Sequence, residues 1–430
     1  MIHMPDTENL IRYTQRPSAG EKAFVVFVLL LSAGAFTNLE VTGSVIRTHN
    51  MEMPEMQAVW ALIYFITPVL YFRNCGRSMR HLFKEWPLIV VIALALSSIL
   101  WSQDPAFTLR RAVALALTFL FGTYFGSRFS LTEQLRLLAL TCWVCIVFSF
   151  IFELLALNTR QVFAGWNGVF YIKSHLGRIM ALGALVFLFW RRAEPSYKGL
   201  ATAGFLASLI LLALSQSMTS MVELALLLTL LPCLQRIARK DTRRMFGELT
   251  LLFATGIASF VWMAAHLEYV TAFLGRNASL TGRIPLWIIS IAMALRRPWL
   301  GYGYDAFWMP DQADTIRIWR VLTWEPPHAH NGFLELWLEL GLAGLTLFLI
   351  VFTYYVLRSI EFYRNSFKPA AIWPLMFLAF LFFANFTDTC FTDRNSIFFI
   401  LYAAAATTTY GERSKVRVTH KFVQSRQSYA

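Results

Sequence analysis

Apolar runs as long as a bilayer is thick recur along almost the whole chain. The hydrocarbon core of a membrane is about 30 Å thick, and a helix needs roughly 20 apolar residues to cross it. Charged residues make up only 15% of the chain, against about 25% in soluble globular proteins. The sequence therefore predicts an all-α polytopic membrane protein with about twelve transmembrane helices, near residues 23–42, 57–73, 86–101, 112–127, 137–157, 176–190, 199–215, 219–235, 246–265, 333–357, 370–387 and 395–410.

Lysine and arginine are distributed unevenly between alternate connections. If the N-terminus is cytoplasmic, 25 of the 38 cationic residues fall in cytoplasmic segments and 12 in exterior ones. Cytoplasmic loops of membrane proteins carry such an excess, so both termini are predicted to be cytoplasmic. The net charge of +13 then reflects topology, and no nucleic-acid partner is predicted.

One connection, residues 266–332, is far longer than the others and lies on the exterior face. Loops of this length are uncommon and usually functional. It contains an amphipathic stretch, Ile284 to Leu295, suited to the membrane surface. The chain thus divides into an N-terminal cytoplasmic segment (1–22), nine helices (23–265), the long loop (266–332), three helices (333–410) and a basic cytoplasmic tail (411–430).

An exterior cluster of cations runs against the topology rule and needs its own explanation. Arginine suits bidentate phosphate binding, and lysine adds a point charge. A lipid-linked phosphate or diphosphate is the obvious anionic partner at a membrane surface, whereas simple contact with lipid headgroups is the alternative. Among these exterior cations are Lys173, Arg178, Arg276 and Arg283, and Arg283, just before the amphipathic stretch, is the strongest candidate for a functional role.

The long loop ends in the sequence Pro326-Pro327-His328-Ala329-His330-Asn331. A histidine at a membrane–water boundary can accept a proton from a hydroxyl group, whereas the alternative is that His330 and Asn331 only cap the next helix. The two histidines could also chelate a metal, but the neighbouring sequence completes no recognisable ligand set, so neither a metal nor another cofactor is predicted.

Acidic residues within or beside the predicted spans form the remaining candidates. Glu335 and Glu339 share one helix face after His330, where they could orient that histidine or bind arginine. Other polar groups lie towards the exterior ends of spans, where each could line a common cavity or belong to a structural ion pair: Glu153, Arg178, Glu223, Asp388 and Asp393.

Short motifs in a fixed order resemble the O-antigen ligase and exopolysaccharide polymerase family of bacterial envelopes, from about residue 95 to 400. Each motif is short, and the specificity lies in their order, spacing and topological side. They are Trp101-Ser102-Gln103-Asp104-Pro105 with Leu109-Arg110-Arg111-Ala112, Gly168-Val169-Phe170 with Lys173 and Leu176-Gly177, Leu214 to Ser220, Thr281-Gly282-Arg283 with Trp287, Gly301-Tyr302-Gly303-Tyr304 with Phe307-Trp308, and His330-Asn331 with Leu334, Glu339 and Gly341.

The chain departs from the family pattern at two positions. The family's His-Lys-Asn reads Ile172-Lys173-Ser174, and the basic residue of its serine-rich hinge is replaced by Met218. Arg283 and His330 are retained, which favours an active enzyme.

The resemblance implies a GT-C-like glycosyltransferase in the bacterial inner membrane with its active site in the periplasm. The donor would be a glycan on undecaprenyl diphosphate, transferred by metal-independent inverting chemistry with His330 as base and Arg283 on the diphosphate. Lys173, Arg178 and Arg276 would be further ligands of the diphosphate, and Glu335, Glu339 and Asn331 would support the site. Membrane lipids and a chain-length regulator are further expected partners.

Three activities remain open at this stage. The Trp101 motif favours a polymerase that joins lipid-linked repeat units into exopolysaccharide or O-antigen. A ligase would instead move the glycan to lipid A-core, and a protein O-glycosyltransferase is a further variant of the acceptor. A polysaccharide transporter or flippase is the alternative outside the enzymes, but the paired, broken helices typical of transporters are not evident in the sequence.

Overall fold

The computed structural model describes residues 16–36, 54–74, 82–155, 165–241, 243–245, 247–248, 250–251, 282–322, 324–366 and 368–410. Within these residues every regular element is a helix, and there is no strand. The helices are α2 (Ala19–Ser32), α3 (Pro54–Asn74), α5 (Trp86–Ser97), α6 (Pro105–Arg128), α7 (Leu131–Leu154), α8 (Lys173–Ala193), α9 (Lys198–Ser215), α10 (Met218–Ala238), α13 (Arg283–Ala294), α14 (Ala313–Leu322), α15 (Gly332–Arg364), α16 (Trp373–Ala384) and Ile397–Tyr410, with short 3-10 turns η1 (Phe83–Glu85), η2 (Ser98–Leu100), η3 (Pro195–Tyr197) and η4 (Pro369–Ile372).

The predicted all-α membrane architecture is confirmed, but the count of twelve long spans is not reproduced. Seven helices among the described residues are long and apolar enough to cross a membrane. Helix α8 is long enough but carries four cations, whereas α2, α16 and Ile397–Tyr410 are apolar but short. Most of the predicted span 246–265 lies outside the described residues.

The closely spaced pair α9 and α10 are two separate helices. The backbone of Gln216 between them is left-handed, with φ 52°. An α-helix cannot continue through a residue in that conformation. The three-residue connection predicted from the sequence is therefore a true turn.

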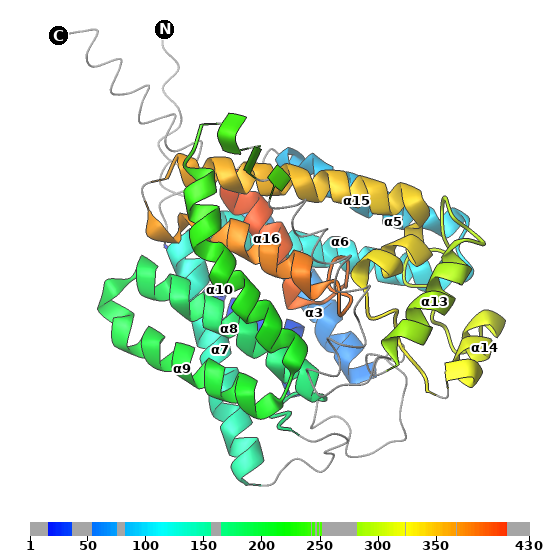
Figure 1. Cartoon of the computed structure of the whole chain (residues 1–430), viewed down its shortest axis with the longest axis horizontal. Coiled ribbons are helices and arrows are strands. Elements are labelled where there is room, and N and C mark those ends of the chain that lie inside the picture. Colours follow the sequence, from blue (N-terminus) through cyan, green and yellow to red (C-terminus); the bar gives the residue numbers. More distant parts are fainter. Residues whose placement is uncertain are drawn as a thin grey trace, which may run out of the picture.

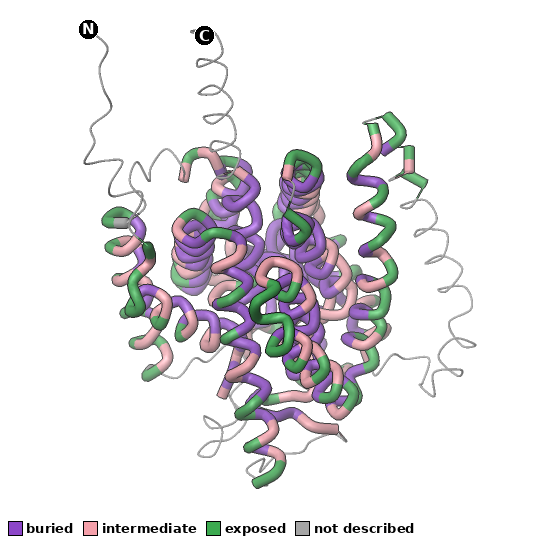
Figure 2. Tube along the Cα trace, turned by 90° about the vertical axis from the view of Figure 1, so that its left-hand side faces the viewer, coloured by how far each residue is buried: buried purple, intermediate pink, exposed green. Residues whose placement is uncertain are grey.

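Helices α7, α9 and α10 pack around α8, and α16 connects them to α15 because it contacts both α10 and α15. Helices α7 to α10 gather at the left of Figure 1, and α15 crosses the top with α5 beneath it. Helices α13 and α14 lie at the right, beside the first turns of α15. Buried residues are concentrated in the middle of the bundle, and exposed residues lie on its periphery (Figure 2). An apolar periphery is what a lipid-facing surface requires.

Segments predicted to share one side of the membrane contact one another in the structure. Such grouping is expected when alternate loops lie on the same face of a helical membrane protein. At the end predicted to be cytoplasmic, polar contacts join Arg128 to Glu21 at 3.0 Å, Arg136 to Glu194, and Lys84 to the ring of Tyr410. The predicted exterior segments meet at the opposite end, where the candidate site lies.

The described part of the long loop has an apolar core of its own. Helix α13 begins at Arg283, one residue before the predicted amphipathic stretch, and a second helix, α14, follows. Their apolar faces pack against the first turns of α15, and the core is formed by Leu286, Met293, Ala294, Tyr302, Phe307, Trp308, Ile318, Ala329 and Leu338. This loop core gives the candidate site a fixed platform.

Helix α15 is broken at Gly341, where the loop docks into it. Gly341 has φ 68° and ψ −173°, which frees backbone groups on either side from their helical partners. Loop residues take their place: the N–H of Tyr302 donates to the carbonyl of Leu338 at 2.8 Å, and the N–H of Leu342 donates to the carbonyl of Pro298 at 2.7 Å. The loop is thereby joined to α15 by backbone hydrogen bonds.

The opposite side of this docked loop is held by the motif that begins at Trp101. The indole N–H of Trp101 donates to the carbonyl of Leu300 at 2.7 Å, and the N–H of Gln103 donates to the carbonyl of Tyr302 at 3.1 Å. Gly303 lies directly against Ser102, where a Cβ atom would approach the serine hydroxyl to 2.5 Å. Two of the sequence motifs are therefore packed together and fix the loop beside α15.

Candidate active site

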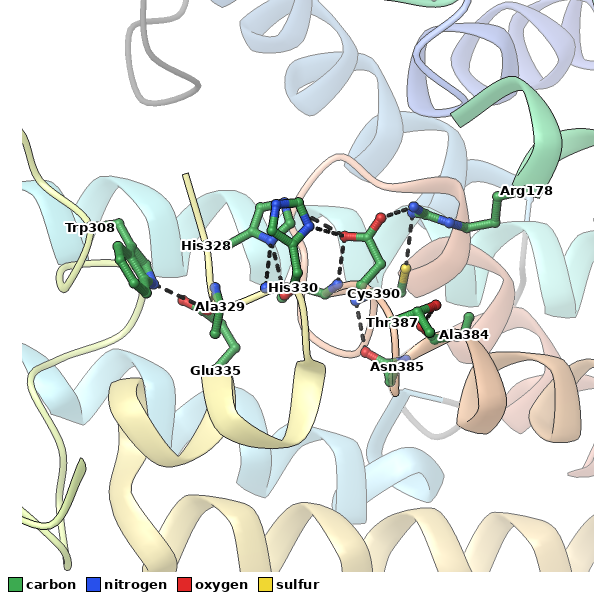
Figure 3. A network of polar contacts seen from close by, with 12 residues as sticks. Arg178, Trp308, His328, Ala329, His330, Glu335, Ala384, Asn385, Thr387 and Cys390 are labelled. Atoms are coloured by element: carbon green, nitrogen blue, oxygen red, sulfur yellow. Dashed lines mark hydrogen bonds and ion pairs between the residues drawn. The ribbon is translucent and has the colours of Figure 1, made fainter. Parts of the chain in front are cut away.

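Two histidines and an aspartate from distant parts of the chain face one another just before α15 (Figure 3). His328 Nε2 lies 3.6 Å from one carboxylate oxygen of Asp388, and His330 Nδ1 lies 3.9 Å from the same oxygen. The two imidazole rings are in edge-to-face contact, with centroids 4.2 Å apart. The three side chains are 14–20% exposed, so the cluster is shielded but accessible to a ligand.

Arg178 of α8 reaches the same cluster. Its guanidinium forms an ion pair with the second carboxylate oxygen of Asp388 and donates a hydrogen bond to Cys390 Sγ at 3.5 Å. Asp388 therefore has the histidines on one oxygen and an arginine on the other. Since α8 is a central helix of the bundle, this ion pair ties the cluster to the membrane domain.

His330 occupies a conformation that is unusual for its residue type. Its backbone is left-handed, with φ 49°, a region that residues other than glycine visit rarely and that is common at functional sites. Its N–H donates to Nδ1 of His328 at 3.1 Å. The turn between the prolines and α15 thus turns both imidazoles towards Asp388.

Carboxylate and indole groups hold the backbone of this turn. Glu335 Oε2 accepts hydrogen bonds from the N–H of Ala329 at 2.6 Å and from the indole of Trp308 at 3.2 Å. The indole of Trp287 in α13 donates to the carbonyl of Ala329 at 3.0 Å. Glu335 therefore holds the backbone at Ala329, the residue between the two histidines.

Asn331 is the residue that caps α15. Its side-chain oxygen accepts from the N–H groups of Phe333 and Leu334, each at 3.1 Å. This satisfies two of the donors that a helix N-terminus leaves unpaired. The capping role considered for both His330 and Asn331 thus belongs to Asn331, and the His330 side chain faces Asp388 instead.

Asn385 joins the aspartate segment to the start of α15. Its backbone carbonyl accepts from the N–H of Gly332 at 2.8 Å, and its side-chain oxygen accepts from the N–H of Cys390 at 2.8 Å. Gly332 is in such close contact that a Cβ atom there would lie 1.9 Å from the Asn385 side-chain oxygen. These contacts fix the position of Asp388 relative to His330.

Arg283 is the first residue of α13 and is partly buried. Burial, and secondly the positive charge of Arg178, lower the pKa of Arg283 to about 10, so the guanidinium is still charged at neutral pH. Within the described residues no carboxylate pairs with it. A partly desolvated cation beside a second arginine is a favourable place for an anion.

The other proposed diphosphate ligands are placed less closely. Lys173 is the first residue of α8, more than one turn before Arg178, and Arg276 lies outside the described residues. Glu339 lies one turn beyond Glu335, where its Oε1 accepts from the N–H of Asp305 at 3.1 Å. The structure therefore places Glu339 with the docked loop.

A second polar cluster surrounds Asp305. Its carboxylate lies 3.2 Å from the guanidinium of Arg111 and 3.5 Å from that of Arg394. Arg111 thus connects the Trp101 motif to the docked loop. This arrangement gives that family motif a role in holding the loop.

Of the other acidic candidates, Glu153 holds a separate turn, whereas Glu223 lies close enough to interact with the charge of Arg178 in the Asp388 cluster. Glu153 accepts hydrogen bonds from the N–H groups of Asn167 and Gly168, at 2.9 and 2.8 Å, and so holds the turn of the Gly168 motif. Glu223 is buried on α10. Of the acidic residues considered at span ends, Asp388 is the one that the structure brings to the histidines.

The three-residue cluster also has the donor atoms of a metal site. Those of His328, His330 and Asp388 all lie within 4.8 Å of one another. Asp388 is far from the two histidines in the sequence, so the spacing of residues around the histidines could not predict it as a third ligand. However, Asp388 is already paired with Arg178, and Arg283 adds a further positive charge. This charge balance favours an anion over a divalent cation.

Comparison with known proteins agrees with the sequence motifs. A family model described as O-antigen ligase matches residues 203–349, a segment that includes Arg283 and His330. The resemblance to the O-antigen ligase family is confirmed. With its seven long apolar helices, the chain is a multi-pass membrane protein similar to a bacterial envelope family of glycan-transfer enzymes.

Two curated proteins are similar to this chain. The exopolysaccharide production protein ExoQ of Rhizobium meliloti (strain 1021) is 26% identical over 346 residues, which cover 78% of this chain and 76% of the relative. A Rickettsia prowazekii (strain Madrid E) protein, whose name assigns it to the polysaccharide ligases, is 28% identical over 142 residues, or 31% of this chain and 35% of that protein. The longer match is thus to the exopolysaccharide protein.

Proposed function

We propose that this protein polymerises undecaprenyl-diphosphate-linked oligosaccharide repeat units at the periplasmic face of the inner membrane, by metal-independent inverting glycosyl transfer. The observation that carries the proposal is the cluster of His330, Asp388 and Arg178 with Arg283 nearby. It offers a base for a hydroxyl group and cationic groups for a diphosphate within one partly shielded site. The O-antigen ligase pattern and the longer match to an exopolysaccharide production protein support it.

In the proposed reaction an acceptor hydroxyl oxygen attacks the anomeric carbon of the donor. The bond from that carbon to the diphosphate oxygen breaks, and its electron pair leaves with the diphosphate. The hydroxyl proton passes to His330. Since Nδ1 of His330 is the nitrogen nearest Asp388, Nε2 is assigned as the proton acceptor, and Asp388 stabilises the imidazolium that forms.

Fixed guanidinium groups stabilise the leaving diphosphate. Negative charge grows on the diphosphate as the bond breaks, and preorganised donors in a shielded site are effective against such charge. Arg283 is the main ligand because it lacks a carboxylate partner among the described residues and its planar fork suits a phosphate. Arg178 is shared with Asp388, so its contribution to the diphosphate is secondary.

The ligase is the second candidate, favoured by the description of the family model. A polymerase keeps its product on undecaprenyl diphosphate, so the product can react again, whereas the product on lipid A-core cannot. Purified protein given only lipid-linked repeat units is expected to build a ladder of products. Repeat units that stay unchanged until lipid A-core is added, and are then transferred once, would assign the protein to the ligases.

The proposed sidedness has a separate test. If residues 266–332 are periplasmic, alkaline phosphatase fused near Gln312 is active and a fusion near Arg239 is inactive, because the enzyme requires export. The basis is the excess of cations in the segments assigned to the cytoplasm. The reverse pattern would refute both the sidedness and the proposed reaction site.

A further inference from the structure

The indole of Trp324 lies against the imidazole of His330. Trp324 is between α14 and the turn that carries the histidines, and it packs on the loop core. The two ring centroids are 5.9 Å apart, and the ring planes are inclined by 30°. This is the offset, nearly parallel arrangement that aromatic rings favour.

The other edge of the same indole faces the turn that starts α13. Trp324 Nε1 lies 3.6 Å from the position that a Cβ atom on Gly282 would occupy. Gly282 has a left-handed backbone with φ 85°, and Arg283 follows it as the first residue of α13. One side chain therefore stacks on the proposed base and lies close to the turn that precedes the proposed diphosphate ligand.

The indole adds a broad stacking face to the contacts that orient the His330 ring. The carboxylate oxygen of Asp388 is 3.9 Å from Nδ1, which is too long for a hydrogen bond that would fix the ring by itself. The ring of His328 meets the imidazole only edge to face. The broad face of the Trp324 indole, anchored on the loop core, restricts rotation of the ring about its side-chain bonds.

We propose that Trp324 is a positioning residue that holds the imidazole of His330 towards the acceptor hydroxyl and maintains its position relative to Arg283. This inference rests on the proposed function, in which His330 is the base. A displacement of about 1 Å at a reacting group can cost on the order of 100-fold in rate. Loss of the indole face should therefore reduce turnover without removing the groups that bind the donor.

Three variants of the full-length protein in detergent or lipid test the proposal with the repeat-unit assay. Trp324→Leu keeps an apolar side chain on the loop core but removes the ring, so kcat is expected to fall about 10- to 100-fold while the donor KM changes little. Trp324→Phe retains an aromatic face and is expected to restore most of the turnover. Trp299→Leu is the matched control, because Trp299 belongs to the same loop but its side chain is 70% exposed.

A second measurement uses the left-handed backbone of His330. Glycine accepts that conformation without strain, so His330→Gly should fold and be rescued in part by added imidazole. We expect rescue to weaken in the double variant His330→Gly, Trp324→Leu, because the added imidazole loses the face on which it stacks. A side chain that only stabilised the fold would not change this rescue.

The outcomes separate this inference from the proposed function. Native turnover of Trp324→Leu together with an inactive His330→Ala would overturn the role of Trp324 alone. Full activity of His330→Ala would instead remove the proposed base. Positioning by the ring would also be contradicted if Trp324→Phe lost as much turnover as Trp324→Leu. A rise in the donor KM of Trp324→Leu as large as its fall in kcat would contradict it too.

Discussion

The ion pair between Arg178 and Asp388 joins α8 to the segment that follows α16, and it places Asp388 beside His330. One carboxylate thereby compensates an arginine and faces a histidine. The side chains of Arg178 and Asp388 are each 14% exposed, so water screens the pair only weakly. Both stability and catalysis should depend on it.

Replacing only Asp388 in the Arg178–Asp388 pair is expected to lower the free energy of unfolding more than replacing both residues. Asp388→Asn leaves Arg178 with its positive charge uncompensated, which costs about 3 kcal/mol in a largely buried pair. The double variant Arg178→Gln, Asp388→Asn should recover much of that loss in thermal unfolding but should not recover transfer, because His330 still lacks its carboxylate. Asp314→Asn is the control, since the Arg296–Asp314 pair is largely exposed and such pairs contribute at most about 1 kcal/mol. Full transfer activity in Asp388→Asn would contradict this role.

Arg283 should destabilise the ligand-free protein. Its pKa in the fold, about 10, is lower than that of an exposed arginine, so folding disfavours the charged form and the penalty persists at every pH below about 10. Arg283→Met removes the charge and should raise the unfolding free energy by on the order of 1 kcal/mol, after allowance for remaining contact with water. The same variant should lose transfer activity.

With the donor bound, the native protein should become more stable than the Arg283→Met variant. A lipid diphosphate that binds the folded protein stabilises it by mass action, and this effect should be large in the native protein and absent in Arg283→Met. Arg283→Lys should be nearly as impaired as Arg283→Met, since lysine lacks the bidentate fork. A less stable Arg283→Met variant with native donor binding would contradict both the cost and the role of this arginine.

Local patterns in the sequence were sufficient to predict most of the described helices. The two apolar runs on either side of residues 216–218 could have been one helix or two, and the structure shows two, whereas the amphipathic pattern places α13 to within one residue. The predicted span 176–190 lies within α8, but hydropathy did not show that Arg178 in its interior reaches Asp388. Arg178 is tolerated there because Asp388 compensates its charge.

Contacts between distant segments could not be predicted in the same way. His328 and His330 were evident as a motif, but their proximity to Asp388 depends on how the segment after α16 folds back on α15. Gly341 was evident as part of the motif that starts at His330, but not as a break in the helix. Nothing local shows that the loop docks there, because the hydrogen bonds involved join backbone groups that every residue carries.

Substitutions at the start of α15 should distinguish catalysis from capping. His330→Ala is expected to abolish transfer while donor binding is largely retained, because a base acts mainly in the transition state. Asn331→Ala removes the cap and should cost about 1 kcal/mol in unfolding free energy, with a smaller loss of turnover. Measured donor affinities, turnover and unfolding curves for the two variants check this. A native transfer rate in His330→Ala would leave the histidine without a catalytic role.

The break in α15 should be sensitive to a single methyl group. Gly341→Ala places a Cβ atom 2.1 Å from the carbonyl of Trp299 and strains a backbone with φ 68°, so the loop should be displaced and both stability and transfer lost. Gly199→Ala is the matched control, since no atom lies within 4 Å of a Cβ atom there, and alanine is favoured over glycine in helices. Proteolysis of the loop measures the displacement. Native protease resistance in Gly341→Ala would show that the docking is not required to hold the loop.

Transfer should survive removal of divalent cations, although His328, His330 and Asp388 could supply three metal ligands. Arg178 already compensates Asp388, and Arg283 adds a second positive charge that has no carboxylate partner among the described residues. A divalent cation would add to this imbalance, whereas a diphosphate would relieve it. Purified protein dialysed against EDTA should therefore keep its turnover and its donor affinity, and metal analysis should find no stoichiometric transition metal. Loss of turnover in EDTA that is restored only by a divalent ion would mean that the two histidines hold a metal, and His330 could not then be the base.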